Sequence, residues 1–228
     1  RILLSGPPGN GKTSLAEAIA ESIAVPMLTV RYDALVGAYL GETNARLARL
    51  FEYARSTPCV LFFDEFDAVG KERGDVHETG EIKRVVSFLL MQIDQLPSYV
   101  VAIAATNHAE LLDRAVWRRF QLRIDMPAPN DSRRAVLIAR FLDSWPESAG
   151  ITPIALAEKV GSASFAEVSE FCQNVRRRHI LSQNGESLSS IVKDELSLWT
   201  SRVIPAEYGI PSAISTSSVR RSSSRRKK

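Results

Sequence analysis

A glycine-rich segment near the start of the chain constrains the fold more than any other feature. Residues 6–13 read Gly-Pro-Pro-Gly-Asn-Gly-Lys-Thr, between an apolar run at residues 2–4 and a stretch with helical spacing that begins at Ser14. Glycines allow a tight turn without Cβ clashes, so successive backbone N–H groups can face one anion. The N-terminus of the following helix adds partial positive charge. This context predicts a phosphate-binding P-loop, and therefore a nucleoside triphosphate ligand.

Each position of the loop has an expected role. Lys12 supplies a point charge to the β- and γ-phosphates, and Thr13 supplies a hydroxyl ligand for Mg²⁺. ATP and Mg²⁺ are thus the expected cofactors, and an accidental glycine-rich turn is the alternative. The residues predicted to contact the nucleotide here are Gly6, Pro7, Pro8, Gly9, Asn10, Gly11, Lys12, Thr13 and Ser14.

Length and cysteine usage limit the class of protein. A chain of 228 residues fits one large domain with a small addition. It begins at Arg1, without Met and almost on the first apolar run, so we expect upstream residues to be missing. No apolar run approaches the roughly 18 residues that suggest a membrane span. Cys59 and Cys172 have neither paired spacing nor neighbouring ligand residues, which indicates buried thiols in a reducing compartment and a cytoplasmic location.

Basic residues gather at the end of the chain. Residues 212–228 contain six Lys and Arg, seven serines and no acidic residue. Without these six, 23 of the 29 Lys and Arg remain against 26 Asp and Glu, so residues 1–211 carry a net charge of −3. The composition predicts disorder for residues 203–228. Such a tail can bind nucleic acid, an anionic membrane or an acidic partner, or it can be a solvated end without a specific role.

Apolar spacing divides the rest of the chain into two parts. Up to residue 127, short strand-like runs alternate with helical spacing, as expected for crossovers that join the strands of a parallel sheet. After Pro127-Ala128-Pro129 the spacing is helical only. We therefore expect an α/β domain over residues 1–127, a doubly wound parallel P-loop sheet of five strands with its N-terminal part missing. An α-helical lid over residues 128–202 follows it.

Two acidic residues follow a continuously apolar run. Residues 60–63 are Val-Leu-Phe-Phe, typical of a strand buried on both faces, and Asp64 and Glu65 come next. The carboxyl ends of parallel strands form the ligand crevice of a doubly wound sheet. There Asp64 is expected to hold Mg²⁺ directly or through water, and Glu65 to act as general base or to position the attacking water. An ordinary surface pair of acids is the alternative.

Three polar residues further along complete the candidate site. Asn107 ends the next predicted strand, where an amide can donate to the γ-phosphate and accept from the attacking water; a turn residue is the alternative. Arg118 and Arg119 suit the charge of a transferring phosphoryl group. A short helix after Asn107 would not bring the two arginines back to the γ-phosphate bound by their own protomer. We therefore predict that they act as catalytic arginine fingers at the nucleotide of a neighbouring protomer in a ring. Two solvated arginines are the alternative.

Taken in order, these motifs resemble the AAA family of ATPases. The form Arg118-Arg119-Phe120 is similar to the katanin and spastin branch. The resemblance implies an ATPase, a homo-oligomeric ring expected to be a hexamer, a polypeptide substrate, and a protease or adaptor as a further partner. The segments that are similar to Walker A, Walker B, sensor 1 and the second region of homology are residues 6–13, 61–65, 105–107 and 113–120.

The same resemblance assigns three further segments. Tyr39-Leu40-Gly41 lies where the family has an aromatic pore loop that grips an extended polypeptide; a plain loop tyrosine is the alternative. Residues 70–80 are similar, more weakly, to a second pore-facing loop. Residues 162–168 resemble the sensor 2 stretch of the lid and assign Ala166 to the nucleotide. Phe165 replaces a frequent glycine there, and the stretch contains no arginine.

The sequence therefore predicts an ATP-driven protein remodeller or unfoldase that draws polypeptide past Tyr39. A nucleic-acid-handling ATPase of the loader or initiator type is the first alternative, and the pore-loop motif and the acidic body weigh against it. A slow nucleotide-dependent assembly scaffold is the second. The presence of Glu65 together with Arg118 and Arg119 weighs against the scaffold.

Overall fold

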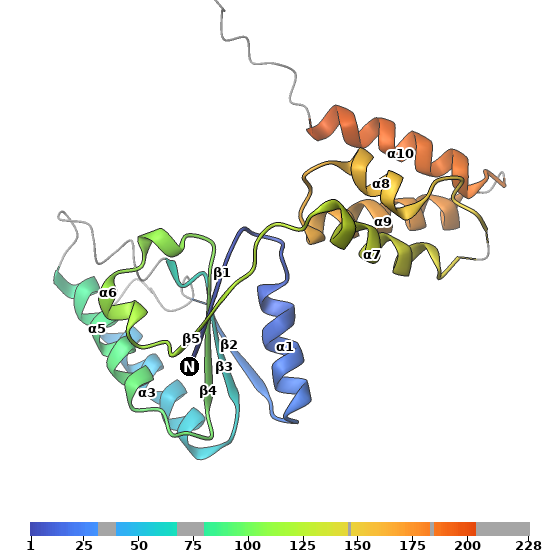
Figure 1. The fold of residues 1–228 in the computed structure, drawn as a ribbon. Coiled ribbons are helices and arrows are strands. Elements are labelled where there is room, and N and C mark those ends of the chain that lie inside the picture. The colour runs from blue at the N-terminus through green and yellow to red at the C-terminus, as the bar shows by residue number, and fades with distance from the viewer. Residues whose placement is uncertain (32–39, 68–79, 146, 183–184, 204–228) are drawn as a thin grey trace, which may run out of the picture.

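The structure, a computed structural model, describes residues 1–31, 40–67, 80–145, 147–182 and 185–203. A sheet covered by helices forms its first part, and a cluster of helices forms its second (Figure 1). The elements of the first part are β1 (Ile2–Ser5), α1 (Lys12–Ser22), β2 (Met27–Arg31), α3 (Leu40–Ser56), β3 (Val60–Asp64), α5 (Gly80–Asp94), β4 (Val101–Thr106), the 3₁₀ turn η1 (Ala109–Leu111), α6 (Arg114–Trp117) and β5 (Leu122–Asp125). Those of the second are α7 (Asp131–Leu142), α8 (Pro153–Val160), α9 (Phe165–Leu181) and α10 (Leu188–Val203).

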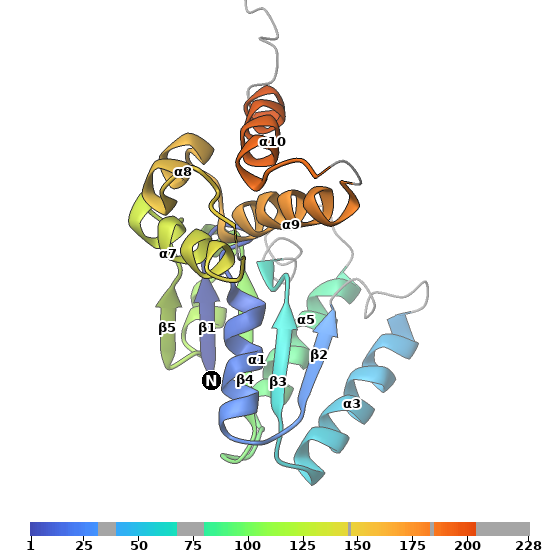
Figure 2. The ribbon, with the colours of Figure 1, turned by 90° about the vertical axis from the view of Figure 1, so that its right-hand side faces the viewer.

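The five strands are all parallel and lie in the order β2-β3-β4-β1-β5. The first strand therefore lies between two strands that come much later in the chain, and Ile2 is level with both Ile103 and Leu122. Because the strands are parallel, their carboxyl ends meet at one edge, below the helical part in Figure 2. The five-stranded parallel sheet confirms the predicted fold class.

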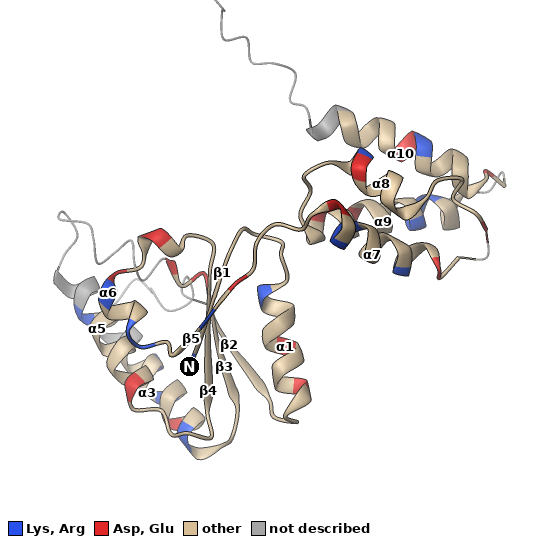
Figure 3. Cartoon of the chain, in the orientation of Figure 1, with Lys and Arg blue, Asp and Glu red and all other residues tan. Residues whose placement is uncertain are grey.

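Both faces of the sheet are buried, and this explains the continuous apolar runs. In β3, Val60 and Phe62 belong to the core under α1, whereas Leu61 and Phe63 belong to the core under α3 and α5. Strands β1 to β4 carry charged residues only at their last positions, and these strands are almost entirely tan in Figure 3. Burial on both faces makes the sheet a rigid support for the loops at its carboxyl edge.

The lid helices α7 to α10 pack around a core of their own, which contains Phe171 and Trp199. Side chains fix where these helices begin. Asn130 accepts a hydrogen bond from the Arg133 N–H at 3.0 Å, and Ser164 forms a capping box with Glu167. The lid therefore starts directly after the Pro-rich connector, and α9 starts beside the sheet edge.

Two simpler predictions concern the whole chain. None of the described helices is long and apolar enough to cross a membrane. Cys59 and Cys172 are buried free thiols, as predicted, and burial raises the pKa of Cys172 to about 12.

Candidate functional site

A cavity of about 420 Å³ opens between the carboxyl edge of the sheet and the lid. Four segments surround it: the loop after β1 with the first turn of α1, the ends of β3 and β4, and the first turn of α9. The residues that line it are Pro8, Gly9, Asn10, Gly11, Lys12, Thr13, Ser14, Asp64, Glu65, Asn107, Phe165, Ala166 and Ser169. Most of the sequence-predicted site is thus brought together in one place.

The loop after β1 leaves the start of α1 open to a ligand. Gly11 precedes the helix with φ of 85°, in the left-handed region, and it provides no side-chain hydrogen bond to the first turn. Backbone N–H groups there have no intrahelical partner. They therefore point toward the cavity with the positive end of the helix dipole, which is an arrangement suited to phosphate.

Lys12 connects this loop to the neighbouring strand β4. Its Nζ donates to the carbonyl oxygens of Gly6 at 2.7 Å and Pro7 at 2.9 Å, and to Oδ1 of Asn107 at 2.7 Å. Burial lowers the pKa of Lys12, and the nearby charges of Asp64 and Asp67 oppose that lowering. An anion that enters the cavity therefore meets a buried lysine already held beside Asn107.

The chain bends sharply where β3 ends. Glu65 has φ of 51°, which is uncommon for a residue with a Cβ and costs on the order of 1 kcal/mol. Its N–H donates to Oδ1 of Asp64 at 2.9 Å, while the Phe66 N–H donates to the Ala105 carbonyl at 2.9 Å. As a result Phe66 returns to the core and Glu65 stays exposed at the cavity.

The residues around the cavity fit a nucleoside triphosphate with a divalent cation. Hard oxygen ligands, the Thr13 hydroxyl and the Asp64 carboxylate, lie in the same cavity as Lys12 and the N-terminus of α1. Within the described ranges no cluster of three or more His, Cys, Asp or Glu could hold a metal alone. Mg²⁺ is usually held by one or two protein ligands together with phosphate oxygens, and Thr13 and Asp64 are two oxygen ligands in this cavity.

The family model described as "ATPase family associated with various cellular activities (AAA)" matches residues 2–128. The chain belongs to the AAA family of ATPases. This membership confirms the resemblance and the predicted ATPase activity, and it implies that the chain binds a nucleotide.

Curated relatives agree with the AAA assignment. An uncharacterized AAA family ATPase of Sinorhizobium fredii is 40% identical over 188 residues, which is 79% of this chain and 54% of that protein. A relative from Danio rerio, named as a katanin p60 ATPase-containing protein, is 33% identical, over 86% of this chain and 43% of the relative. A cell division cycle protein 48 homolog of Archaeoglobus fulgidus is 36% identical, over 75% of this chain and 24% of the relative. The chain therefore spans about half the length of these relatives, or less.

Sequence reasoning missed Asp67 of this AAA domain. Its side chain is 8% exposed, and Oδ1 accepts hydrogen bonds from the Thr106 hydroxyl at 3.2 Å and from the Asn107 N–H at 3.4 Å. It thus ties the end of β3 to the turn that carries Asn107. The only sequence signal for Asp67 is that an acidic residue stands two positions after Glu65. The sequence does not distinguish such a residue from an ordinary acidic residue on the surface.

The lid contacts the P-loop directly. The Ala166 N–H donates to the Gly9 carbonyl at 2.9 Å, and Ala166, in the stretch that resembles sensor 2, lines the cavity. A Cβ added to Gly9, whose φ is 74°, would lie 2.7 Å from Oγ of Ser164. Phe165 also lines the cavity, whereas no arginine does so among the described residues.

The predicted finger residues lie away from this cavity. Arg118 and Arg119 precede β5, whose first residue is level with Ile2 at the opposite end of the strands from the P-loop. The Arg119 guanidinium is bound to Asp94 through Nε at 2.9 Å and donates to the Ala115 carbonyl at 2.7 Å. Arg118 is exposed, and its guanidinium forms no hydrogen bond or ion pair within the described part of the chain. Neither arginine reaches the nucleotide site of its own protomer.

The predicted pore loop falls largely outside the described residues. Tyr39 and residues 70–79 are not among them, and Leu40 and Gly41 are the first residues of α3. The basic tail, residues 204–228, is also outside.

Proposed function

We propose that this AAA ATPase works in a homo-oligomeric ring, expected to be a hexamer, and uses ATP hydrolysis to remodel or unfold polypeptides. The observation that carries the proposal is the cavity shared by the P-loop, two strand ends and the lid helix α9. A nucleotide in that cavity contacts both the sheet domain and the helical lid. Its hydrolysis therefore changes the contacts between the domain and the lid. Relatives named as a cell division cycle protein 48 homolog and a katanin p60 ATPase-containing protein support a ring machine of this kind.

Binding of ATP uses groups that are already oriented. The N–H groups at the start of α1 and the Lys12 ammonium bind phosphate oxygens, and Lys12 exchanges its contacts with the Gly6 and Pro7 carbonyls for them. Thr13 and Asp64 are the residues that would hold Mg²⁺. Bound Mg²⁺ supplies neutralisation of charge on the β- and γ-phosphate oxygens.

Hydrolysis needs a base and a way to orient water. Glu65 is exposed at the cavity and accepts a proton of the attacking water. The water oxygen bonds to the γ-phosphorus as the bond from that phosphorus to the bridging oxygen breaks, and ADP leaves with the electron pair. The side-chain amide of Asn107 aligns that water with the phosphate; its oxygen accepts from Lys12, and the backbone N–H of Asn107 donates to Asp67. Arg118 supplies charge from the adjacent protomer.

The work on substrate is assigned to the segment before α3. Tyr39, with Leu40 and Gly41, is proposed to grip extended polypeptide, because an aromatic ring offers large contact area with few rotamers to freeze. A cytoplasmic location, based on the two free thiols, and a protease or adaptor partner belong to the same proposal.

Tyr39→Ala tests this function. We expect ATP hydrolysis without substrate to stay within a few-fold of the unmodified chain, while unfolding of a fluorescent protein fused to an unstructured peptide falls at least about tenfold, as loss of aromatic contact on a polymer predicts. The matched control is Tyr53→Ala, which removes an exposed tyrosine from α3. Glu65→Gln is expected to bind ATP without hydrolysing it. It therefore gives the background level of substrate unfolding in the absence of ATP hydrolysis. Unchanged unfolding by Tyr39→Ala would reject the pore-loop assignment.

A further inference from the structure

One arginine of the lid is buried although it does not line the nucleotide cavity. Arg134 lies in the first turn of α7 and is 6% exposed, whereas the three residues before it, Asp131, Ser132 and Arg133, are exposed. A buried guanidinium loses its hydration, so it is stable only where acceptors of the protein replace water. Those acceptors therefore indicate what Arg134 does.

The acceptors of Arg134 come from two segments on either side of the lid helices α7 and α8. Its Nη1 donates to the carbonyl oxygen of Pro129, in the connector between sheet and lid, and to that of Ala163, at 3.5 Å, in the turn before α9. Its Nη2 donates to the carboxylate of Asp131, which forms an ion pair with it across one turn of α7. One side chain thus joins the connector to the turn from which α9 begins.

Both of these segments also contact the P-loop. On the connector side, the carbonyl of Met126 accepts a hydrogen bond from Nδ2 of Asn10 at 3.4 Å. On the side of α9, the Ala166 N–H donates to the Gly9 carbonyl at 2.9 Å. Arg134 therefore closes a ring of contacts that runs from the P-loop through the connector to the lid, and back to the P-loop.

We propose that Arg134 is a positioning residue for the nucleotide, which acts through residues 163–166. By holding Ala163 to the connector, it keeps the first turn of α9, with Phe165 and Ala166, docked at the cavity. Only a guanidinium, with five N–H donors in a planar fork, can reach two carbonyl oxygens and a carboxylate from one buried position. This role rests on the proposal that the cavity binds ATP, and it depends neither on the ring nor on the pore loop.

Loss of the Arg134 contacts should affect ATP binding more than ATP hydrolysis. Without them the turn before α9 is docked for only a fraction of the time, and the apparent affinity falls in proportion to that fraction. Docking for about a tenth of the time weakens ATP binding about tenfold. Once ATP is bound, its contacts with Phe165 and Ala166 favour the docked lid, so kcat at saturating ATP should change less than about threefold.

The test compares Arg134→Met with the unmodified chain. Methionine keeps a flexible, unbranched side chain and removes every donor. We expect a fluorescent ATP analogue to bind about tenfold more weakly. Without nucleotide, the Ala166 N–H should exchange at least about tenfold faster in amide-resolved hydrogen-exchange mass spectrometry, while the N–H groups of Phe171 and Val175, in the middle of α9, keep their protection. Arg134→Lys retains a charged donor and should recover part of both quantities.

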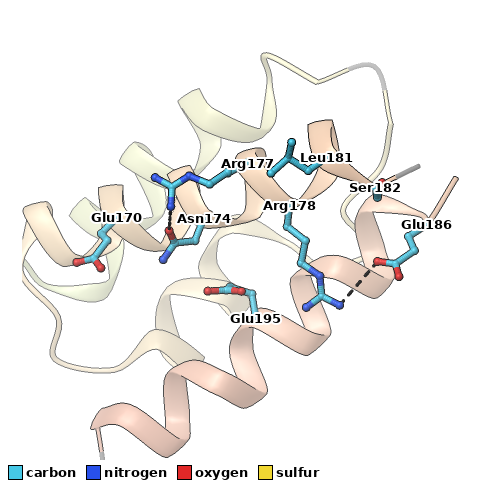
Figure 4. Close-up of a pocket in the computed structure, with 8 residues that line it drawn as sticks. All are labelled: Glu170, Asn174, Arg177, Arg178, Leu181, Ser182, Glu186 and Glu195. Atoms are coloured by element: carbon cyan, nitrogen blue, oxygen red, sulfur yellow. Dashed lines mark hydrogen bonds and ion pairs between the residues drawn. The ribbon is translucent and has the colours of Figure 1, made fainter. Parts of the chain in front are cut away.

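Two further variants serve as controls. Arg177→Met removes an exposed arginine from the same helix α9, and it should change ATP affinity less than about twofold. Arg177 contacts Asn174 at 3.5 Å and lines a different pocket, of about 640 Å³, between α9 and α10 (Figure 4). Lys12→Ala should lose ATP binding. Normal binding by Lys12→Ala would overturn the nucleotide site itself, and the role of Arg134 with it.

Three other results would overturn the role of Arg134 alone. In the first, the Ala166 N–H keeps its protection in Arg134→Met. In the second, kcat falls while ATP affinity is unchanged, or Arg134→Lys is as poor as Arg134→Met. In the third, the middle of α9 loses protection to the same extent as Ala166, which would make Arg134 a residue that only stabilises the lid.

Discussion

Single side chains hold the reactive groups of the nucleotide site in position. Asn107 is fixed from two directions, because its amide oxygen accepts from Lys12 and its N–H donates to Asp67. Asp67 also accepts from the Thr106 hydroxyl, which is 1% exposed. Asp67 itself does not line the cavity. We therefore propose that Asp67 is a positioning residue, which acts on the nucleotide through Asn107.

Asp67→Ala should lower kcat by about ten- to a hundredfold with little change in ATP affinity, because a misplaced Asn107 no longer aligns the attacking water. Asp67→Asn retains one carbonyl acceptor and should recover part of kcat. Steady-state kinetics and a separate ATP-binding titration measure the two quantities. The exposed acid Asp143, changed to alanine, is the control. A change confined to ATP affinity, or an asparagine variant as poor as the alanine variant, would refute the positioning role.

At the scale of elements, the contact between the P-loop and α9 determines how the lid sits on the nucleotide site. Ala166 donates to the Gly9 carbonyl, and the absence of a Cβ at Gly9 leaves room for Ser164. The Ser164–Glu167 capping box fixes the first turn of α9 at this point. Lid and sheet thus approach each other through backbone rather than through long side chains.

Gly9→Ala should reduce ATP affinity more than Gly11→Ala does. Both glycines have positive φ, 74° and 85°, so alanine costs about 1–2 kcal/mol of backbone strain at either position. Only at Gly9 does the new Cβ collide with the lid, since nothing lies within 4 Å of a Cβ at Gly11. The affinity of each variant for a fluorescent ATP analogue measures the effect of the lid collision on binding. Urea unfolding of both variants measures the backbone strain that they share. Equal losses of affinity would mean that the lid contact is unimportant for binding.

The sequence predicted those parts of the site that local motifs carry. Residues 6–13 form their own turn, and Asp64 and Glu65 follow their strand directly, so no knowledge of distant contacts was needed. Asp67 could not be predicted, because its role depends on β3 and β4 being neighbours in the sheet. The contact of Gly9 with Ala166 depends on how the lid docks, and the Arg119–Asp94 ion pair depends on where α5 ends. Alternation of strands and helices likewise predicted a parallel sheet but not its strand order.

At the scale of the whole molecule, the two arginines proposed as fingers lie away from the cavity proposed to bind the nucleotide. Arg119 is held by Asp94, whereas Arg118 is exposed without a partner among the described residues. A separate finger and pocket can combine only across an interface between copies, as in a closed ring with a repeated head-to-tail contact. Arg118 is thus the arginine better placed to act in a neighbour.

Mixing two inactive variants tests this arrangement. Arg118→Ala keeps its pocket and loses its finger, and Lys12→Ala keeps its finger and loses its pocket. In equal random mixtures about a quarter of the interfaces pair an intact pocket with an intact finger, so partial ATPase activity should return. The control replaces Arg118→Ala with Lys159→Ala, an exposed cation on α8, which should be active alone. Absence of any recovery, despite co-assembly shown by mass spectrometry, would count against fingers acting between protomers.

The position of β1 in the sheet has a consequence for how the chain matures on the ribosome. Its hydrogen-bonding partners are β4 and β5, so β1, the earliest of the five strands in this sequence, is paired on both sides only when the latest of them has been made. At 5–20 residues per second, the delay before Leu122 exists is roughly 6–24 s. During that time β1 can pair with β4 but has no partner on its other side, and pairing over such a sequence separation is slow. A nascent chain that stops short of β5 therefore leaves one edge of the strand before its P-loop unpaired, even though every residue of the P-loop has already been made.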